Sequence, residues 1–286
     1  MIPAGKFLDF SLEQITPTAE EEFFTSLKLR NGTYKTTFQR RFTDIDHALL
    51  KFIESGDIAV DNVMDVGISS GSSTLELYQE LHAAGYKSRI TGTDMTPDAY
   101  FISVFPGCFA LVDDTGYPLR YDILNRTMKP WVVSEDYRSG FFVLRKCINI
   151  FLGRRAKRLM HQTDSMNVRK VKLITPRLRD YADITVQKDD ITQYNGAFED
   201  RFSFIRVANV LNKGYFTNEE LASIIGNIRQ YLARPRGALL VVRTHENGTN
   251  HGSLFVIYKD GECKVLQRFG QGSEIEHIVL GCMQGP

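Results

Sequence analysis

Apolar residues recur at helical spacing in the first part of the chain. One stripe has steps of four, three, four and three residues, and it consists of Phe38, Phe42, Ile45, Leu49 and Phe52. An earlier helix is predicted to begin at Thr18, because Thr18 and Glu21 have the spacing of a capping box. We therefore expect residues 1–58 to form a helical cover.

From about residue 60, short apolar runs alternate with helical segments. Residues 60–86 predict a strand, a turn rich in glycine and serine, and a helix, and residues 88–95 predict a second strand. The alternation returns with three further apolar runs, at 183–191, 202–211 and 236–244. A capping box formed by Thr217 and Glu220 predicts a helix between the last two runs. Strands joined through helices lie parallel with right-handed crossovers, so the pattern predicts an α/β fold with a mostly parallel sheet.

The end of the chain has a different pattern. Residues 252–270 predict an antiparallel hairpin that turns at residues 259–261, and residues 274–281 predict a final strand. The sheet is therefore expected to have an antiparallel edge.

Residues 98–180 interrupt the alternation. A hairpin that turns near Thr115 and Gly116 is the clearest local signal within them. We expect an inserted lid subdomain at about 98–180, within a domain that spans residues 59–286.

Charge is balanced overall but uneven along the chain. The 286 residues include 35 Lys and Arg and 34 Asp and Glu, so the total charge gives no reason to expect a polyanionic partner. Residues 138–172, however, contain ten basic residues and one acidic residue. Apolar residues interleave with the basic ones between Arg145 and Arg158, which predicts an amphipathic basic helix. A solvated helix face explains this segment, and weak contact with an anionic membrane is the alternative; nucleic acid is a less favoured partner.

Four widely spaced cysteines without a C-x-x-C pair argue against a zinc site or a disulfide scaffold. The N-terminal residues do not show a basic leader followed by an apolar stretch, and no apolar run approaches 18 residues. These features predict a cytoplasmic protein without a metal.

The segment Asp65-Val66-Gly67-Ile68-Ser69-Ser70-Gly71 lies where the first predicted strand meets its helix. Small residues there allow close approach of a ligand to the backbone N–H groups at a helix N-terminus. The spacing G-x-G-x-x-G is not met, because Ser69 and Ser72 occupy two of its glycine positions. A nicotinamide or flavin enzyme is therefore disfavoured.

This segment resembles the first motif of the class I S-adenosylmethionine-dependent methyltransferases, which have an acid followed by G-x-G-x-G on a Rossmann-like sheet. Ser69 replaces the middle glycine. The resemblance implies that the loop Gly67, Ser69 and Gly71 lies against the methionine part of the cofactor. It also implies that Asp65 orients the methionine amino group.

The resemblance extends to the ends of later strands. Asp94 ends the second strand, where the family places a carboxylate on the two ribose hydroxyls, with Met95 beside it. Asp190 and Ile191 match the acid and the apolar neighbour that contact the adenine, and Asp189 is a competing assignment for the acid. Asn209 is expected at the cofactor-facing end of the strand that follows.

Residues 204–211 and 232–242 resemble the family's fourth strand and the entry to its fifth. The run from Asn209 to Phe216 most resembles the chemotaxis-receptor branch of the family. In all, the likeness covers about residues 60–97 and 182–243. It implies S-adenosylmethionine as cofactor and S-adenosylhomocysteine as product. The family methylates acceptors of many classes on one fold, so the resemblance does not identify the acceptor. We favour a small-molecule acceptor, and a protein acceptor is left open.

Candidates for acceptor chemistry follow the fifth strand. His251 is a candidate general base, because histidine is the side chain that most often serves in that role. Arg243 is able to hold an anionic acceptor, and Tyr215 and Arg206 are further candidates for acceptor contact. An ordinary hydrogen-bonded surface loop explains the same residues.

Two other functions fit part of the pattern. Gly67-Ile68-Ser69-Ser70-Gly71 also reads G-x-S-x-G, the nucleophile elbow of serine α/β-hydrolases, with Ser69 as nucleophile and His251 or His277 as base. The replacement of a glycine by Ser69 also leaves open a protein that binds S-adenosylmethionine without catalysis.

Overall fold

The chain forms two compact units. The computed structural model describes residues 1–35, 38–132, 134–162, 166–258 and 262–283. The small unit comprises Met1–Phe38 and Thr96–Arg177, and the large unit comprises Gln39–Met95 and Leu178–Pro286. The segment Thr96–Arg177 is therefore inserted into the large unit, and the first 38 residues fold with the insertion.

In its described residues, the large unit contains one seven-stranded sheet and four α-helices. The strands are β1 (Asn62–Val66), β2 (Arg89–Asp94), β8 (Ile184–Lys188), β9 (Phe204–Ala208), β10 (Arg236–Thr244), β11 (Asn250–Tyr258) and β12 (Cys263–Phe269). The α-helices are α3 (Thr43–Glu54), α4 (Ser72–Ala83), α7 (Asn218–Tyr231) and α8 (Glu276–Met283). Short 3₁₀ helices lie at η2 (Pro176–Asp180), which crosses the boundary between the units, and at η3 (Gly196–Phe198).

The order of strands in this sheet is β12-β11-β10-β9-β1-β2-β8. Five neighbouring strands of the sheet are parallel, and they are β8, β2, β1, β9 and β10. The strands β11 and β12 add an antiparallel edge. If the five parallel strands are numbered 1 to 5 along the chain, their order across the sheet is 3-2-1-4-5. This is the arrangement of a doubly wound Rossmann-like sheet. The predicted α/β fold, mostly parallel with an antiparallel edge hairpin, is confirmed.

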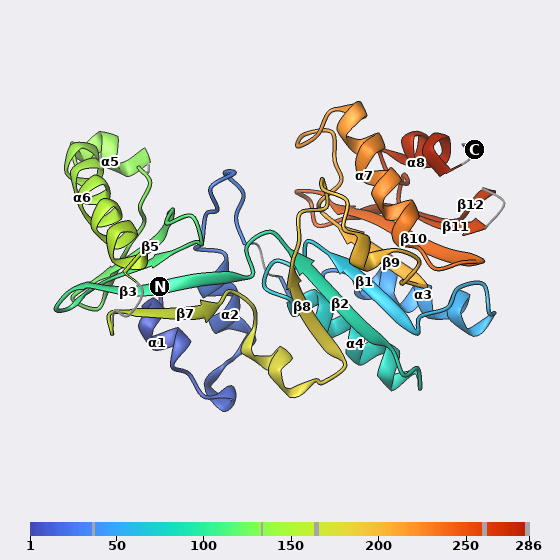
Figure 1. Ribbon diagram of the computed structural model, residues 1–286, viewed down its shortest axis with the longest axis horizontal. Coiled ribbons are helices and arrows are strands. Elements are labelled where there is room, and N and C mark those ends of the chain that lie inside the picture. Colours follow the sequence, from blue (N-terminus) through green and yellow to red (C-terminus); the bar gives the residue numbers. More distant parts are fainter. Residues whose placement is uncertain (36–37, 133, 163–165, 259–261, 284–286) are drawn as a thin grey trace. The chain divides into compact units, whose positions relative to one another are not determined.

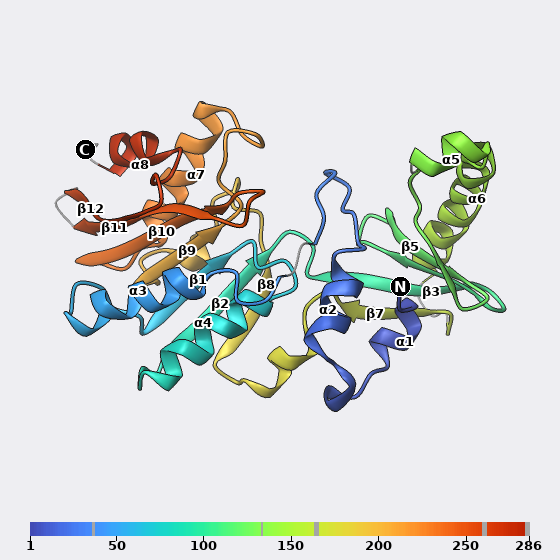
Figure 2. The same cartoon turned by 180° about the vertical axis from the view of Figure 1, so that it is seen from behind.

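Helices cover both faces of the large sheet (Figures 1 and 2). On one face, Ile225 of α7 and Val279 of α8 share a buried core with Met64 and Val207 of the strands. On the other face, Arg206 of β9 reaches the backbone of α4 and a side chain of α3. The large unit is thus a three-layer structure, and residues that alternate along β1 and β9 face different helices.

The small unit contains a five-stranded antiparallel sheet with the order β6-β5-β4-β3-β7. Its strands are β3 (Asp98–Phe105), β4 (Cys108–Val112), β5 (Pro118–Ile123), β6 (Arg126–Met128) and β7 (Val168–Lys172). Its helices are α1 (Ala4–Leu8), η1 (Leu12–Gln14), α2 (Pro17–Phe24), α5 (Ser134–Ser139) and α6 (Phe142–Met160).

Each face of the small sheet has its own core. Leu152 and Ala156 of α6 pack with Ile102 and Tyr121 on one face. On the other face, apolar residues of α1 and α2 pack against Ala99, Leu111 and Leu119, and they are Ala4, Phe7, Phe23 and Phe24. The predicted hairpin at Thr115 and Gly116 joins β4 to β5, and the predicted basic amphipathic helix is α6.

The N-terminal segment is divided differently from the prediction. Residues 1–58 are expected to form one cover, whereas α1 and α2 pack with the small sheet and α3 belongs to the large unit. The first long helix is α2, and its N-cap is Thr16 rather than Thr18: the Thr16 side chain accepts a hydrogen bond from Ala19 N–H at 3.2 Å. Pro17 follows Thr16, and its fixed φ suits the first helical position.

The prediction of a final strand at residues 274–281 is wrong, because residues 276–281 lie in helix α8 and the two residues before them form a turn. Ile275, Val279 and Met283 are all buried, and their spacing of four places them on one helical face against the core. The short apolar run hid this helical period. The predicted hairpin turn at 259–261 lies outside the described residues, and in the described part of the chain no helix is long and apolar enough to span a membrane.

Helix α8 provides a test through its glycine. Gly281 is exposed within α8, and an added Cβ there meets nothing within 4 Å. We expect Gly281→Ala to raise the free energy of unfolding by roughly 0.5–1 kcal/mol, because alanine loses less backbone entropy in a helix. Urea unfolding of the large unit would measure this difference. Gly226→Ala in α7, which also meets nothing within 4 Å, is the matched control; loss of stability in Gly281→Ala alone would contradict the helix.

Candidate functional site

The carboxyl ends of the five parallel strands meet at one edge of the large sheet. In open α/β sheets this edge is where ligands bind. Most of the residues predicted to bind a cofactor follow these ends, and they are Gly67, Ser69 and Gly71 after β1, Asp94 and Met95 at the end of β2, Asp190 and Ile191 after β8, and Asn209 after β9. The edge is therefore the candidate site.

The turn between β1 and α4 is fixed by backbone bonds and by two glycines. The N–H groups of Gly67 and Ile68 both donate to Thr93 O, at 2.8 and 3.0 Å. Gly67 has a φ of 71°, and a Cβ there would lie 2.2 Å from Val210 Cγ2. Gly71, with a φ of 80°, is the N-cap of α4. Both glycines are needed for the turn itself.

Ser69 and Asp94 join the turn to the neighbouring strand. Ser69 has a φ of 56°, a left-handed conformation that favours glycine and that the family's middle glycine would adopt without strain. Its N–H donates to Asp94 Oδ2 at 2.8 Å. The half-buried Asp94 carboxylate therefore lies against the loop that follows β1, and exposed Met95 follows it.

Asp65 faces into the protein. Its carboxylate accepts hydrogen bonds from Arg206 Nε at 2.9 Å, from Arg206 Nη2 at 2.7 Å and from Thr74 Oγ1 at 2.7 Å. Asp65 and Arg206 are register partners on β1 and β9, and both are buried. Asp65 therefore has an internal role, with both carboxylate oxygens engaged.

Arg206 is fully buried, which excludes the predicted contact with an acceptor. Its guanidinium also donates to Ser73 O at 2.9 Å and lies 5.7 Å from the centre of the Phe42 ring. A second carboxylate, Asp46 of α3, is 3.5 Å from Arg206 Nη1. Sequence motifs do not reveal this cluster, although a charged residue within each of two apolar strands, Asp65 in β1 and Arg206 in β9, is a visible signal.

Asp189 and Asp190 differ in how their oxygens are used. Asp190 Oδ1 accepts from Thr192 N and Thr192 Oγ1, which closes a local turn. Asp189 Oδ1 accepts from Asn195 Nδ2 at 2.9 Å, whereas its buried Oδ2 has no hydrogen-bond partner among the described residues. Burial raises the pKa of Asp189. Because Ile191 is buried in the core under α7, Asp189 fits a ligand N–H better than the pair Asp190 and Ile191.

Asn209 links the ends of β9 and β10. It has a φ of 60°, its side-chain Oδ1 accepts from Thr244 N at 2.7 Å, and its own N–H donates to Val242 O. Asn209 is thus at the expected edge, where it positions the end of β10.

Apart from the buried Arg206, three candidates for acceptor chemistry remain, and the structure brings them together only in part. Arg243 and His251 are register partners on β10 and β11, and the His245 ring lies 4.3 Å from that of His251. Arg243 is paired with Glu274 at 2.6 Å. Tyr215 is exposed in the segment before α7, and among the described residues it forms no hydrogen bond or ion pair with Arg243 or His251.

The sheet order disfavours the serine-hydrolase interpretation. β9 and β10 separate β11, which carries His251, from β1, which precedes Ser69. Three strand spacings amount to about 14 Å, whereas a catalytic base must lie within hydrogen-bond distance of its serine. His277 lies on α8, the helix that follows the last antiparallel strand, β12, in the chain. In the described part of the chain no cluster of side chains could hold a metal ion.

Comparisons with known proteins give distant structural likenesses. The CMeT domain of the citrinin polyketide synthase is 13% identical, covers 72% of this chain and 35% of its own, and has a TM-score of 0.36. The CurJ carbon methyltransferase is 14% identical, with coverage of 71% and 34% and a TM-score of 0.34. A phosphoethanolamine N-methyltransferase 2 from Haemonchus contortus, in complex with phosphomonomethylethanolamine and S-adenosylhomocysteine, is 12% identical, with coverage of 88% and 37% and a TM-score of 0.34.

This chain spans only about a third of the length of these proteins. No protein-family model and no curated protein sequence matches it. At such identities and TM-scores, the likenesses establish neither a shared activity nor a shared substrate. The predicted likeness to the chemotaxis-receptor branch also stays a prediction.

The buried cluster around Arg206 predicts a dependence of stability on pH. Burial raises the pKa of Asp46 from 3.8 to about 7, although Arg206 opposes the rise. Because the folded pKa is the higher one, the contribution of Asp46 to stability is full below about pH 3.8 and is lost as the pH rises through 7. The side chain of asparagine does not ionise. We therefore expect the free energy of unfolding of Asp46→Asn, relative to that of the native protein, to be higher at pH 8 than at pH 5. Urea unfolding at both values would measure this, and parallel pH profiles would contradict it.

Proposed function

We propose that this protein binds S-adenosylmethionine at the carboxyl edge of its large sheet and transfers the methyl group to an acceptor. One observation carries the proposal: the Asp94 carboxylate, at the end of β2, accepts the Ser69 N–H of the loop after β1. This contact puts a carboxylate and a tight loop side by side at a helix N-terminus, within the 3-2-1-4-5 strand order.

The residues at this edge suit the cofactor at two points. Asp94 is half-buried, and a carboxylate accepts several hydrogen bonds at once, so it is able to take the vicinal hydroxyls of a ribose. Asp189 Oδ2 is buried without a hydrogen-bond partner among the described residues, and an adenine amino group would supply one. Asp65 acts through Arg206 in this proposal, as a positioning residue that holds β1 under the loop.

When bound, S-adenosylmethionine supplies a methyl group on a positive sulfur, whose carbon–sulfur bond breaks with its electron pair left on sulfur. The protein then has to align the acceptor with that bond and, for a hydroxyl or amine acceptor, remove a proton. His251 is the candidate base. Arg243 forms an ion pair with Glu274. To hold an anionic acceptor, Arg243 would have to leave Glu274 and pair with the acceptor instead.

The proposed acceptor is a small molecule, with a protein as the alternative. On α6, two of the basic residues predicted to meet an anionic membrane have other partners: Arg145 pairs with Asp136, and Arg155 donates to Val104 O. Exposed apolar residues remain on the same helix, including Val143, Ile150 and Phe151. Weak contact of residues 138–172 with an anionic membrane thus stays part of the proposal, as does a cytoplasmic location.

Calorimetric titration tests the cofactor site directly. We expect saturable binding of both S-adenosylmethionine and S-adenosylhomocysteine to the native protein. Asp94→Ala should weaken both by roughly 10- to 150-fold, because hydrogen bonds to a charged group contribute about 1.5–3 kcal/mol. The matched control is Asp61→Ala, which removes an exposed carboxylate just before β1, at the opposite edge of the sheet.

The proposal fails if the folded native protein binds neither compound, or if Asp94→Ala and Asp61→Ala have the same effect. Transfer of a labelled methyl group from S-adenosylmethionine to a small-molecule extract then separates an enzyme from a protein that only binds the cofactor. Reaction of Ser69 with a fluorophosphonate probe would instead support the hydrolase.

A further inference from the structure

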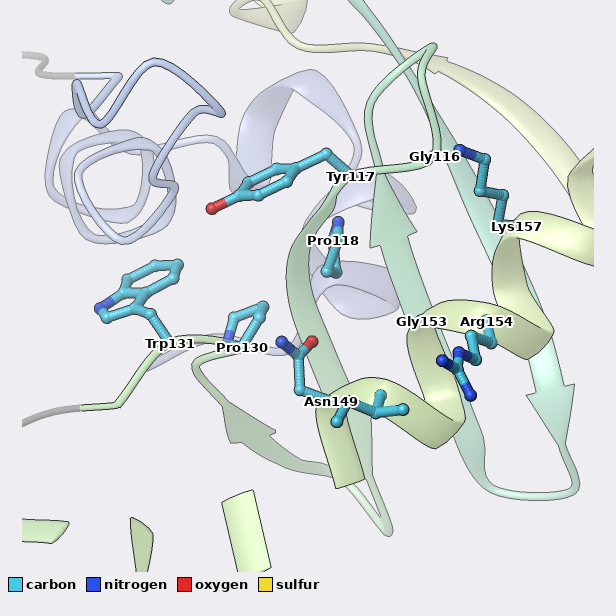
Figure 3. Close-up of a pocket in the computed structure, with 10 residues that line it drawn as sticks. Gly116, Tyr117, Pro118, Pro130, Trp131, Asn149, Gly153, Arg154 and Lys157 are labelled. Atoms are coloured by element: carbon cyan, nitrogen blue, oxygen red, sulfur yellow. The ribbon is translucent and has the colours of Figure 1, made fainter. Parts of the chain in front are cut away.

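The small unit contains a cavity of about 400 Å³ formed entirely by its own elements (Figure 3). It lies between the β4–β5 turn, the segment after β6 and helix α6. The cavity is lined by Gly116, Tyr117, Pro118, Pro130, Trp131, Asn149, Ile150, Gly153, Arg154 and Lys157. Its size suits a small molecule.

One row of α6 forms a wall of the cavity. Asn149, Gly153 and Lys157 are four residues apart, which places them on one face of the helix. A Cβ on Gly153 would lie 3.2 Å from the Tyr121 hydroxyl. A glycine inside a helix costs about 0.5–1 kcal/mol relative to alanine. Gly153 therefore leaves room beside Asn149 at the expense of helix stability.

The Asn149 amide has a fixed orientation. The buried Tyr121 hydroxyl donates to Asn149 Oδ1 at 2.8 Å. Burial raises the pKa of Tyr121, so the hydroxyl stays protonated and keeps this donor role. With Oδ1 occupied, Asn149 presents its Nδ2 donor for a ligand at the cavity.

Two cations line the same space. Arg154 and Lys157 are exposed, and neither has an acidic partner among the described residues. The stem of Lys157 packs against the turn, where a Cβ on Gly116 would lie 2.9 Å from Lys157 Cγ. On that turn, Asp113 Oδ1 accepts from Thr115 and from Tyr117 N–H, so this carboxylate is engaged locally. The cavity therefore combines two positive groups with an amide donor.

Aromatic and proline rings supply its apolar part. Trp131 is held by the Tyr34 ring, whose centre is 6.0 Å away, and by Lys28, whose Nζ is 5.9 Å from the indole centre. Tyr117 and Trp131 border the same space in Figure 3, with Pro130 between Trp131 and Asn149. Such surfaces favour a planar ring.

We propose that this cavity is a binding site for a small aromatic phosphate ester. The ring lies against Trp131 and the prolines, and the phosphate oxygens accept from Asn149 Nδ2, Arg154 and Lys157. Two cations match the double negative charge of a phosphate monoester. This site does not depend on the proposed methyl transfer, because each of its residues belongs to the small unit.

Trp131 is the only tryptophan of the chain, so its fluorescence reports on this cavity alone. Titration of the full-length protein with phenyl phosphate should give a saturable change. Inorganic phosphate has the charge without the ring, and benzyl alcohol has the ring without the charge. We expect each to bind at least about tenfold more weakly, since each loses one of the two sets of contacts.

A pair of double variants tests the charge. Arg154→Gln with Lys157→Gln should weaken phenyl phosphate at least about tenfold, because the charge-assisted hydrogen bonds are lost. Lys146→Gln with Arg158→Gln removes the same charge from α6 at exposed residues outside the cavity and should leave the affinity unchanged. Absence of saturation in the native protein, or equal weakening in both double variants, would overturn the proposal. Circular dichroism would confirm that both variants are folded.

Discussion

Two opposite charges that meet inside the large unit, Asp65 on β1 and Arg206 on β9, are the contact on which its arrangement depends. They join neighbouring parallel strands and, through Thr74 and Asp46, hold α4 and α3 against the same face of the sheet. Without Arg206, the buried Asp65 carboxylate would keep the Thr74 hydroxyl, and without Asp65, the guanidinium would keep Asp46 at 3.5 Å. Removal of one partner of a buried ion pair typically costs about 3–5 kcal/mol. The strands held in this way end in the segments of the candidate site, so the pair positions the site without contacting a ligand.

The candidate site is itself a consequence of how the chain turns after each parallel strand. The loop after β1 needs positive φ values at Gly67, Ser69 and Gly71, and the Ser69 N–H then meets the Asp94 carboxylate from the next strand. The insertion leaves the large unit directly after this strand, at Thr96. The tight loop and the carboxylate therefore meet within the large unit, and the carboxylate lies two residues before the point at which the chain leaves that unit.

The small unit follows a different physical plan. Its antiparallel sheet has helices on both faces, and the basic helix α6 divides its residues between the core and a cavity. Leu152 and Ala156 pack on the sheet, while Gly153 and Asn149 leave space beside it. The charge of the segment 138–172 is only partly a solvated face, because Arg145 and Arg155 bind other groups of the unit. The position of each residue on α6, toward the sheet or toward the cavity, therefore decides its role, and the composition of the segment does not.

The sequence by itself determined the local elements and their order. Strand–turn–helix units, the capping box at Thr217 and the antiparallel hairpin are set by neighbouring residues, and so they were predictable. The helix α8 was not, because a short apolar run has no distinct period until its core is known. Motif spacing likewise indicated that Asp94 ends β2 at the carboxyl edge of the sheet. It could not show that Arg206 contacts both oxygens of Asp65, or that one oxygen of Asp189 has no hydrogen-bond partner among the described residues. Partners far apart in the chain are chosen by sheet register and burial, and only the tertiary structure decides those.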